Sequence, residues 1–348
     1  MKLAAVVSKH NLEFKNPAKT SRNTLTQKPL WLIQLFNEKQ PSVKGIGEIS
    51  PLKSLSIDDV DGFEDKLNQI VQLINEGISP QDLSLEQWPS INFGLETAML
   101  DLANGGIRKI FDTSFYTKGT KLPINGLVWM GDSANMLEQA KEKIADGFTC
   151  IKFKIGALDF DEECRMLEAL RRKHNAFEVE IRLDANGAFA PDTALEQLKE
   201  LFRFEVHSIE QPIKQGQWDA MQEICAKSKI PVALDEELIG VPVSTQGQKL
   251  LTATKPAYII LKPGLLGGFE ASKQWINLAI KNNIGWWVTS ALESNVGLNA
   301  IAQFTSQYKV TMPQGLGTGQ LYTNNFESPL QMQKGYISYV PTKGWTIF

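Results

Sequence analysis

The spacing of hydrophobic residues changes along this chain, and each spacing predicts a different kind of secondary structure. Apolar and polar positions alternate in the first fifty residues, so residues 30–36 and 43–49 are predicted to form an antiparallel hairpin, with residues 1–7 as a first strand. The polar stretch 16–24 is predicted to be a loop. From residue 57 to about residue 106, apolar residues recur at intervals of three and four, which predicts helices. Antiparallel strands followed by helices make an α+β unit.

A regular alternation of strands and helices begins near residue 122. The predicted strands cover residues 122–129, 149–153, 179–183, 207–209, 232–234, 258–261, 285–289 and 314–316. Amphipathic helices are predicted at residues 133–146, 160–172, 192–202, 218–226, 268–282 and 295–305. This alternation is typical of a parallel β/α barrel. We therefore expect an α/β protein in which residues 119–320 form a modified (β/α)8-type barrel. Residues 1–118 are expected to form an α+β capping domain, with part of residues 320–348 packing back on it.

Ionisable residues end five of the predicted strands. Lys154, Asp184, Glu210, Asp235 and Lys262 follow one another at intervals of 25 to 30 residues, and each closes a short apolar run. A strand, a helix and two loops take about that many residues. In a closed parallel barrel the C-terminal strand ends meet at one mouth, where enzymes of this architecture keep their chemistry. We therefore expect these five side chains to converge.

Three of these residues are carboxylates, which are hard oxygen ligands. The three histidines of the chain are scattered, so neither a histidine-based zinc site nor a Ser/His/Asp triad is expected. Asp184, Glu210 and Asp235 instead suit Mg²⁺ or Mn²⁺. The alternative for each carboxylate alone is a helix cap or an ion pair with a nearby lysine, but the even spacing of all three favours a metal site.

The lysines predict acid–base chemistry beside that metal. Lys152 and Lys154 are two residues apart, so both point to the same side of a strand. Like charges in that position are costly unless they face a pocket, and their repulsion is expected to lower the pKa of at least one of them toward the range of a general base. Lys262 lies across the mouth, where Pro263 and Gly264 break the strand. The alternative is a strand end with solvated lysines.

Composition limits the remaining possibilities. The chain has 348 residues, 43% of them hydrophobic, and a net charge of −3, which gives no electrostatic case for a nucleic-acid partner. No apolar stretch is long enough to span a membrane, and the N-terminus is expected to be a strand, not a signal peptide. The three cysteines show no pairing pattern and are expected to be thiols in a reducing compartment, the cytoplasm. The oligomeric state stays open.

Short motifs around these residues resemble a known family. Lys-x-Lys ends at Lys154, Asp-Ala-Asn begins at Asp184, Glu-Gln-Pro at Glu210, Asp-Glu at Asp235 and Lys-Pro-Gly at Lys262. This set is similar to that of the enolase superfamily, in its muconate-lactonizing subgroup, and the resemblance covers nearly the whole chain. It implies that the three carboxylates hold Mg²⁺, and that a lysine, Lys154 or Lys262, abstracts the proton alpha to a substrate carboxylate.

The resemblance also bears on the reaction, because members of this subgroup differ in chemistry. Some dehydrate their substrate to o-succinylbenzoate, some cycloisomerise muconates, and some racemise acyl amino acids or epimerise dipeptides. Residues 290–294 (Ser-Ala-Leu-Glu-Ser) and the glycine-rich residues 315–319 resemble the dehydrating members. The resemblance thus implies a hydro-lyase that dehydrates a succinyl-hydroxycyclohexadiene carboxylate in menaquinone biosynthesis. A racemase or epimerase is the alternative, and a non-catalytic binding protein on the same fold is a further one.

Six residues are candidate substrate contacts. They are Ser290, Glu293, Gly264 and Gly317 at strand ends of the barrel, and Arg22 and Ser50 in loops of the cap that are expected to close over the mouth. For Ser290 and Glu293 the alternative is a helix N-cap and a first-turn acid, and both roles are compatible. Lys152 is expected to tune Lys154 and to hold a carboxylate.

Overall fold

An antiparallel sheet opens the chain. The computed structural model describes residues 2–19 and 24–345, and the sheet consists of β1 (Leu3–Lys19), β2 (Thr24–Asn37) and β3 (Gln40–Ile49) in the order β1-β2-β3. The predicted hairpin of residues 30–36 and 43–49 is confirmed. The predicted loop at residues 16–24 is wrong in its first part, because β1 continues to Lys19 past an irregularity between Glu13 and Ala18. An irregularity of this kind shifts the register of a strand, so a polar stretch can remain paired with the neighbouring strand although its sequence does not alternate between apolar and polar residues.

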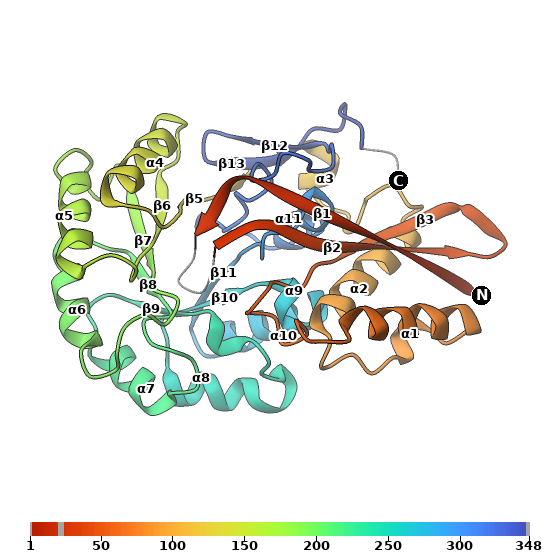
Figure 1. Ribbon diagram of the computed structural model, residues 1–348, viewed down its shortest axis with the longest axis horizontal. Helices are drawn as coiled ribbons and strands as arrows, with labels where there is room; N and C mark the ends of the chain where they lie inside the picture. The colour runs from red at the N-terminus through yellow and green to blue at the C-terminus, as the bar shows by residue number, and fades with distance from the viewer. Residues whose placement is uncertain (1, 20–23, 346–348) are drawn as a thin grey trace.

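Two long helices pack on this sheet. The helical segments are α1 (Phe63–Glu76), η1 (Pro80–Asp82) and α2 (Pro89–Ala103), followed by the short α3 (Ser114–Lys118). Strand β3 lies directly against α2, since a Cβ added to Gly47 would sit 1.8 Å from the carbonyl oxygen of Gly94. Glycines at these positions therefore allow β3 and α2 to pack closely in the core of the cap. In Figure 1 this cap lies on the right, and the far ends of β1 and β2 reach toward the barrel.

A parallel sheet forms the barrel. Its strands are β5 (Gly126–Val128), β6 (Cys150–Lys154), β7 (Glu180–Asp184), β8 (Ser208–Glu210), β9 (Val232–Leu234), β10 (Tyr258–Leu261) and β11 (Gly285–Val288), hydrogen-bonded in sequence order. These strands agree with the predicted ones to within one or two residues, except that the first predicted strand is split. Its beginning, β4 (Leu122–Pro123), pairs with the C-terminal hairpin of β12 (Leu330–Gln333) and β13 (Tyr336–Tyr339).

The predicted eighth strand is reduced to isolated bridges that close the barrel. Gln314 makes a parallel bridge to Ile124, and Gly315 makes one to Thr289. The Gly315 amide donates to the Val288 carbonyl oxygen at 2.8 Å. Residues 314–315 thus join the first barrel strand to the last.

Helices cover the outside of this sheet. They are α4 (Ser133–Ala145), α5 (Phe160–Arg171), α6 (Ala194–Leu201), η2 (Phe202–Phe204), α7 (Trp218–Lys227), η3 (Glu236–Leu238), α8 (Gln248–Thr254), α9 (Pro263–Leu266), α10 (Gly268–Lys281) and α11 (Asn295–Thr305). The sequence did not predict α8, which follows a π-helical turn at Val243–Gly247. The polar run in this turn interrupts the helical period of apolar residues. In Figure 1 helices α4 to α8 curve around the left side.

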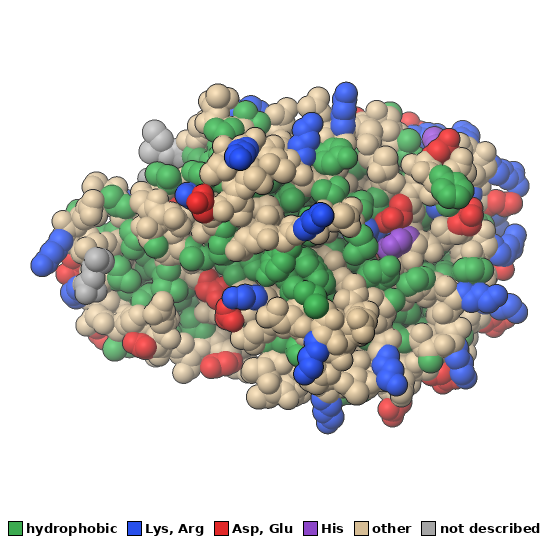
Figure 2. All heavy atoms as spheres, turned by 180° about the vertical axis from the view of Figure 1, so that it is seen from behind, with side chains coloured by type: hydrophobic (Ala, Val, Ile, Leu, Met, Phe, Trp, Pro, Cys, Tyr) green, Lys and Arg blue, Asp and Glu red, His purple; other side chains and the backbone are tan. Residues whose placement is uncertain are grey.

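The C-terminal segment touches both parts of the molecule. Phe14 of β1 forms a bridge with Tyr322, and the Lys15 amide donates to the Leu321 carbonyl oxygen at 2.8 Å. The domain boundaries at residues 118 and 320 stay predictions. On the face shown in Figure 2, the basic and acidic side chains that the structure describes are interspersed. Among the described residues, no helix has the length and apolar character needed to cross a membrane.

Strand register places the ionisable residues in one layer. Lys154 pairs with Asp184, and Asp184 pairs with Glu210, across three adjacent strands. Residues between them along the strands, such as Phe153 and Leu183, point the other way and are fully buried in the main hydrophobic core. Alternation along each strand therefore puts apolar residues under the helices and charged residues inside the barrel.

Candidate active site

The three predicted carboxylates lie on neighbouring strands. Asp184 and Glu210 end β7 and β8, and Asp235 directly follows β9. Each side chain is almost completely buried, with at most 2% of its surface exposed. Gln211 holds this edge in place, because its side-chain oxygen accepts hydrogen bonds from the backbone amides of Asp235 and Glu237 at 3.2 Å each. Buried carboxylates need partners of opposite charge to remain ionised.

Lysines supply those partners. The ammonium nitrogen of Lys152 lies 2.7 Å from Glu210 Oε2 and 2.9 Å from Asp184 Oδ2. Lys154 pairs with the same oxygen of Asp184 at 2.9 Å, and Lys262 pairs with Asp235. The structure thus brings together all three predicted carboxylates and all three predicted lysines in one buried ion-pair network.

This network decides the pKa of each group. Burial alone would lower the pKa of Lys152, but Asp184 and Glu210 outweigh it and raise that pKa above its ordinary value. Burial likewise would lower the pKa of Lys262, but the charges of Asp235, Glu210 and Glu236 together outweigh it and raise that pKa. The expected lowering of a lysine pKa therefore does not occur at Lys152, since the carboxylates are closer to it than the sequence could show. Burial, with repulsion from Asp184, raises the pKa of Glu210 well above its ordinary value.

The donor set fits a hard divalent cation. Glu210 Oε1 is buried and has no hydrogen-bond partner among the described groups, so one ligand oxygen is left for an ion. Among residues 2–19 and 24–345, no three histidine, cysteine or acidic side chains are grouped tightly enough to hold a metal as they stand. In this arrangement Lys152 bridges Asp184 and Glu210, and Lys154 and Lys262 each pair with one carboxylate. Metal binding therefore requires those ammonium groups to give up part of their ion pairing.

Asn186 extends the network, although it was not among the predicted site residues. Lys154 donates to Asn186 Oδ1 at 2.8 Å, and Asn186 Nδ2 donates to Glu236 Oε1 at 3.0 Å. The backbone of Asn186 has a positive φ of 46°, a conformation that asparagine tolerates better than most residues. The Asp-Ala-Asn motif was the sequence signal for this residue. Asn186 directs the Lys154 amine toward the cavity.

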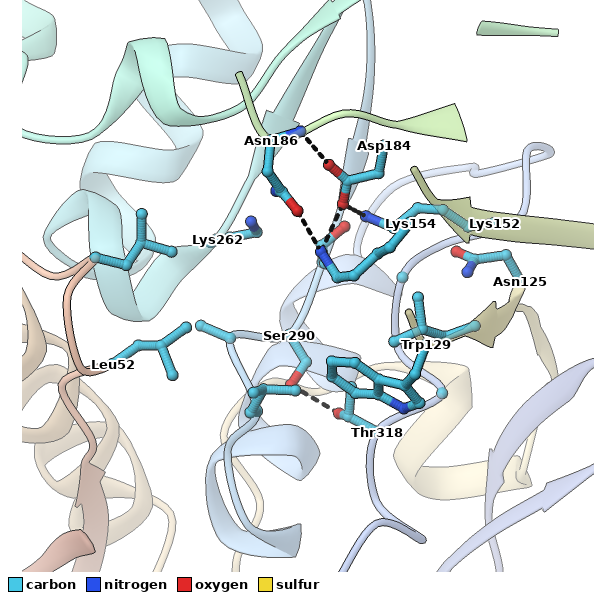
Figure 3. A pocket seen from close by; sticks show the side chains of 17 residues that line it. Leu52, Asn125, Trp129, Lys152, Lys154, Asp184, Asn186, Lys262, Ser290 and Thr318 are labelled. Carbon is cyan, nitrogen blue, oxygen red and sulfur yellow. Dashed lines mark hydrogen bonds and ion pairs between the residues drawn. The ribbon is translucent and has the colours of Figure 1, made fainter. Parts of the chain in front are cut away.

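A small, partly open cavity of about 80 Å³ lies at this mouth. Figure 3 shows Lys152, Lys154, Asp184, Asn186 and Lys262 along one part of it, with Ser290 and Thr318 along another. The remaining lining residues are Leu52, Leu55, Asn125, Leu127, Trp129, Thr289, Ala291, Leu292, Gly315 and Gly317. Leu52 and Leu55 come from the cap, so the segment after β3 does close over the barrel. Glu210 and Asp235 do not line the cavity, but each is paired with a lysine that does: Glu210 with Lys152, and Asp235 with Lys262.

The predicted substrate contacts divide into three groups. Ser290 and Gly317 line the cavity. Glu293, Gly264 and Ser50 do not line it: Glu293 accepts a hydrogen bond from Ser290, and a Cβ added to Gly264 would lie 3.0 Å from Glu293 Oε1. Ser50 is buried beside Lys28, which donates to its side-chain oxygen. Arg22 lies outside the described residues.

Sequence reasoning missed several lining residues. Trp129 ends the first predicted barrel strand and Thr318 lies in the glycine-rich segment 315–319, but no motif assigned either residue a role. Lys28, which does not line the cavity, lies outside every predicted strand and had no signal of its own, yet its side chain is only 2% exposed. Burial of this kind depends on contacts between the cap and the barrel, which no local pattern encodes.

Family models match both parts of the chain. A model described as "Enolase C-terminal domain-like" matches residues 135–347, and one described as "MenC, N-terminal domain" matches residues 4–102. Fold and family models together place the protein in the enolase superfamily, whose members use a divalent metal.

Individual relatives show which family of the enolase superfamily this chain belongs to. An o-succinylbenzoate synthase from Desulfotalea psychrophila is 44% identical over 94% of this chain and 96% of its own. The crystal structure of MenC from the same organism has a TM-score of 0.86 at 41% identity and covers 97% of this chain and all of that chain. This chain therefore belongs to the o-succinylbenzoate synthase family. An L-Ala-D/L-Glu epimerase from Bacillus subtilis, with a TM-score of 0.85 at 18% identity, shares the fold.

Proposed function

We propose that this protein dehydrates a succinyl-hydroxycyclohexadiene carboxylate to o-succinylbenzoate, a step of menaquinone biosynthesis, with Mg²⁺ as its metal. The observation that carries the proposal is the convergence of Lys154, Lys262 and Asp184 on one cavity, with two further carboxylates directly beneath it. The identity with the D. psychrophila synthase supports the choice of reaction. The partner is a small-molecule carboxylate. The three free cysteines fit a reducing compartment such as the cytoplasm.

Asp184, Glu210 and Asp235 would hold the Mg²⁺ ion. Three carboxylates without histidine or cysteine suit a hard ion. When bound, the cation supplies positive charge that stabilises the negative charge developing on a substrate carboxylate. Because Lys152 bridges two of these carboxylates, its ammonium group is also positioned to bind the substrate carboxylate near them.

Lys154 would carry both proton transfers. As the free amine it takes the proton alpha to the carboxylate, and the electrons of the C–H bond move into the carboxylate system. As the resulting ammonium it then gives that proton to the hydroxyl group on the neighbouring carbon. The C–O bond breaks and water leaves. Asn186 keeps the amine aimed at the cavity during both steps, through the hydrogen bond at 2.8 Å.

Lys262 would act mainly through its charge. It lines the cavity from a different strand and is paired with Asp235. Its raised pKa keeps it cationic at neutral pH, where it stabilises negative charge on the substrate. Cap residues Leu52 and Leu55 exclude water from the same space.

The direct test is dehydration of the succinyl-hydroxycyclohexadiene carboxylate by the purified protein with added Mg²⁺. We expect formation of o-succinylbenzoate, followed by its ultraviolet absorbance, and loss of turnover in the Lys154→Ala variant. A wild-type protein that does not form the product under these conditions would refute the proposal.

A racemase or epimerase is the second candidate. Lys154 and Lys262 line one cavity from different strands, and two lysines in that relation can serve as a pair of bases. Solvent deuterium exchange into both enantiomers of an N-succinyl amino acid, without dehydration of the cyclohexadiene, would favour this function.

A further inference from the structure

One buried glutamine contacts all three strand ends that carry the proposed metal ligands. Gln211 directly follows Glu210, at the end of β8, and is completely buried. Its backbone carbonyl oxygen accepts from the Gly187 amide, in the loop after β7, at 2.7 Å, and its own amide donates to the Ala233 carbonyl oxygen in β9 at 2.9 Å. Its side chain accepts from the backbone amide of Asp235. A single residue therefore links the backbones of the three strand ends.

The side-chain amide of Gln211 uses its full hydrogen-bonding capacity. A primary amide has two N–H donors and one oxygen with two lone pairs. The oxygen accepts from the backbone amides of Asp235 and Glu237 at 3.2 Å each. The nitrogen donates to the Ile213 carbonyl oxygen at 3.0 Å and to Glu237 Oε2 at 3.1 Å. These four bonds fix one orientation, because an amide turned over would place its N–H groups against backbone N–H groups.

Glu237 selects that orientation. Its carboxylate is buried, and Oε1 accepts from the Gly216 amide and from Trp218 Nε1 at 2.8 Å each. With the bond from Gln211, three donors point at this carboxylate, and an ionised carboxylate carries acceptors only. The nitrogen of the glutamine amide must therefore face Glu237, and its oxygen must face the amides of the next strand end.

A count of donors shows what an isosteric change at this position does. In Glu237→Gln, one carboxylate oxygen is replaced by an NH2 group. If that group faces Gly216 and Trp218, donors meet donors. If it faces Gln211 instead, two NH2 groups meet, unless the Gln211 amide turns over and loses its bonds to the backbone amides of Asp235 and position 237. Every arrangement leaves a buried donor without its acceptor, which is unfavourable.

We propose that Gln211, oriented by Glu237, is a positioning residue that fixes the backbones of the three ligand-bearing strand ends before a metal ion binds. The inference deepens the proposed function and rests on its Mg²⁺ site. When an ion binds, only the ligand side chains then have to leave their lysine partners. Order that exists in advance lowers the cost of binding, and hydrogen bonds that hold metal ligands from behind contribute to metal affinity.

Hydrogen exchange of the metal-free wild type tests this inference without any substitution. The amides of Asp235, Glu237 and Gly187 all donate to Gln211. We expect them to exchange at least about 100-fold more slowly than in an unstructured chain, even without metal. Added Mg²⁺ should slow them no more than it slows the amides of the cap sheet, which report the general stabilisation by a ligand. Protection of these three amides that appears only with Mg²⁺ would overturn the inference.

The affinity of the metal-free protein for Mg²⁺, measured by titration calorimetry, tests the role of Glu237. We expect Glu237→Gln to weaken Mg²⁺ binding about tenfold or more, the usual effect of losing such a supporting hydrogen bond. Glu163→Gln is the matched control, because Glu163 is also a buried carboxylate and accepts from the Gly156 amide at 2.7 Å. It supports the loop after β6, a strand that carries no proposed metal ligand, so its Mg²⁺ affinity should stay at the wild-type value.

The contrary results are distinct from one another. An equal loss of Mg²⁺ affinity in Glu237→Gln and Glu163→Gln would reflect the general removal of a buried charge, and the inference would be wrong. Wild-type affinity in Glu237→Gln would overturn it as well. If Glu237→Gln does not fold, the exchange measurement on the wild type decides. A wild type that binds no Mg²⁺ would refute the proposed metal site itself, which is a different failure.

Discussion

At the scale of single residues, the site consists of buried charges that stabilise one another only as a set. Lys152 contacts both Asp184 and Glu210, so removing any one of the three breaks an ion pair of at least one other. Leaving a buried charge unpaired costs several kcal/mol, by comparison with other proteins on the order of 3–5 kcal/mol. Variants at these positions must therefore be close in shape, and each needs a measurement of folding beside the measurement of activity.

The first prediction concerns the proposed metal ligands. Asp184→Asn, Glu210→Gln and Asp235→Asn each keep shape but remove a negative charge, so we expect activity to fall at least about 100-fold. EDTA should abolish wild-type activity, and added Mg²⁺ should restore it. Asp192→Asn, at an exposed position, is the matched control. Full activity in excess EDTA would contradict the metal assignment.

The second prediction separates the roles proposed for Lys154 and Lys262. Lys154→Ala removes the base and the acid together, so dehydration should fall about 1,000-fold or more. Lys262→Arg keeps a cation and should retain more dehydration activity than Lys262→Ala. Initial rates of product formation measure all three, with the exposed Lys173→Ala as control.

A different outcome would identify Lys262 as a base. Arginine cannot exchange protons near neutral pH. If Lys262→Arg and Lys262→Ala are equally inactive, and each still exchanges one enantiomer of an acyl amino acid with solvent deuterium, the racemase alternative holds.

At the scale of elements, two acidic side chains of the cap fix the N-termini of two barrel helices. Glu96 of α2 accepts from the backbone amides of Phe269 and Glu270 at the start of α10. Glu48 of β3 does the same for α11, through Ser294 and Gly297. Helix N-termini favour negative charge and leave amides without partners inside the helix. The cap therefore contacts the N-termini of the two helices, α10 and α11, that precede and follow β11, the seventh strand of the barrel.

The third prediction follows from the burial of Glu96. Burial raises the pKa of Glu96 to about 7, above its value in an unfolded chain. The folded state therefore binds this proton more tightly than the unfolded state does. Its stabilising effect is complete at acidic pH and is lost as the pH rises through 7.

Unfolding in urea at pH 5.5 and pH 8.5 tests this linkage. From the lower to the higher pH, the wild type should lose on the order of 1–3 kcal/mol of unfolding free energy relative to Glu96→Gln, which cannot ionise. Glu142→Gln, at an exposed position, should follow the wild type. An equal pH dependence in the wild type and Glu96→Gln would show that Glu96 does not titrate in this range.

At the scale of the whole molecule, the cap and the barrel share one active site. Leu52 and Leu55 of the cap line the cavity. Tertiary contacts also tie the chain ends together, since β13 pairs with β4 at the start of the barrel and Tyr322 bridges to β1. Unfolding of the cap alone would expose the cavity to water.

The fourth prediction tests this coupling at Glu48. Glu48→Gln keeps the shape but weakens the hydrogen bonds to Ser294 and Gly297, because these bonds lose the help of a charge. We expect the unfolding free energy to fall by about 1–3 kcal/mol and the proteolysis of the cap to become faster. Glu142→Gln again serves as control. Unchanged stability together with unchanged proteolysis would mean that this contact does not hold the cap.

Local sequence patterns determined the order of elements and the main site residues. Strands alternate with helices at a spacing that can only be met by parallel pairing, and strand ends then fall at one mouth whatever the details of packing. Lys154, Asp184 and Glu210 could therefore be assigned to one layer from spacing alone, and the strand register confirms that layer. The hairpin of the cap, at residues 30–36 and 43–49, could likewise be predicted from the local alternation of apolar and polar residues.

Only the tertiary structure decided which groups meet across the chain. The closure of the barrel at residues 314–315 depends on single bridges to Ile124 and Thr289, which have no periodic signal. The pKa of Lys152 depends on carboxylates from two other strands, and these reverse the direction expected from its lysine neighbour. Leu52 and Leu55 line the cavity only because the cap packs on the barrel. Periodicity records which face of an element is buried, but electrostatic energies depend on distances between elements, and those distances exist only in the folded chain.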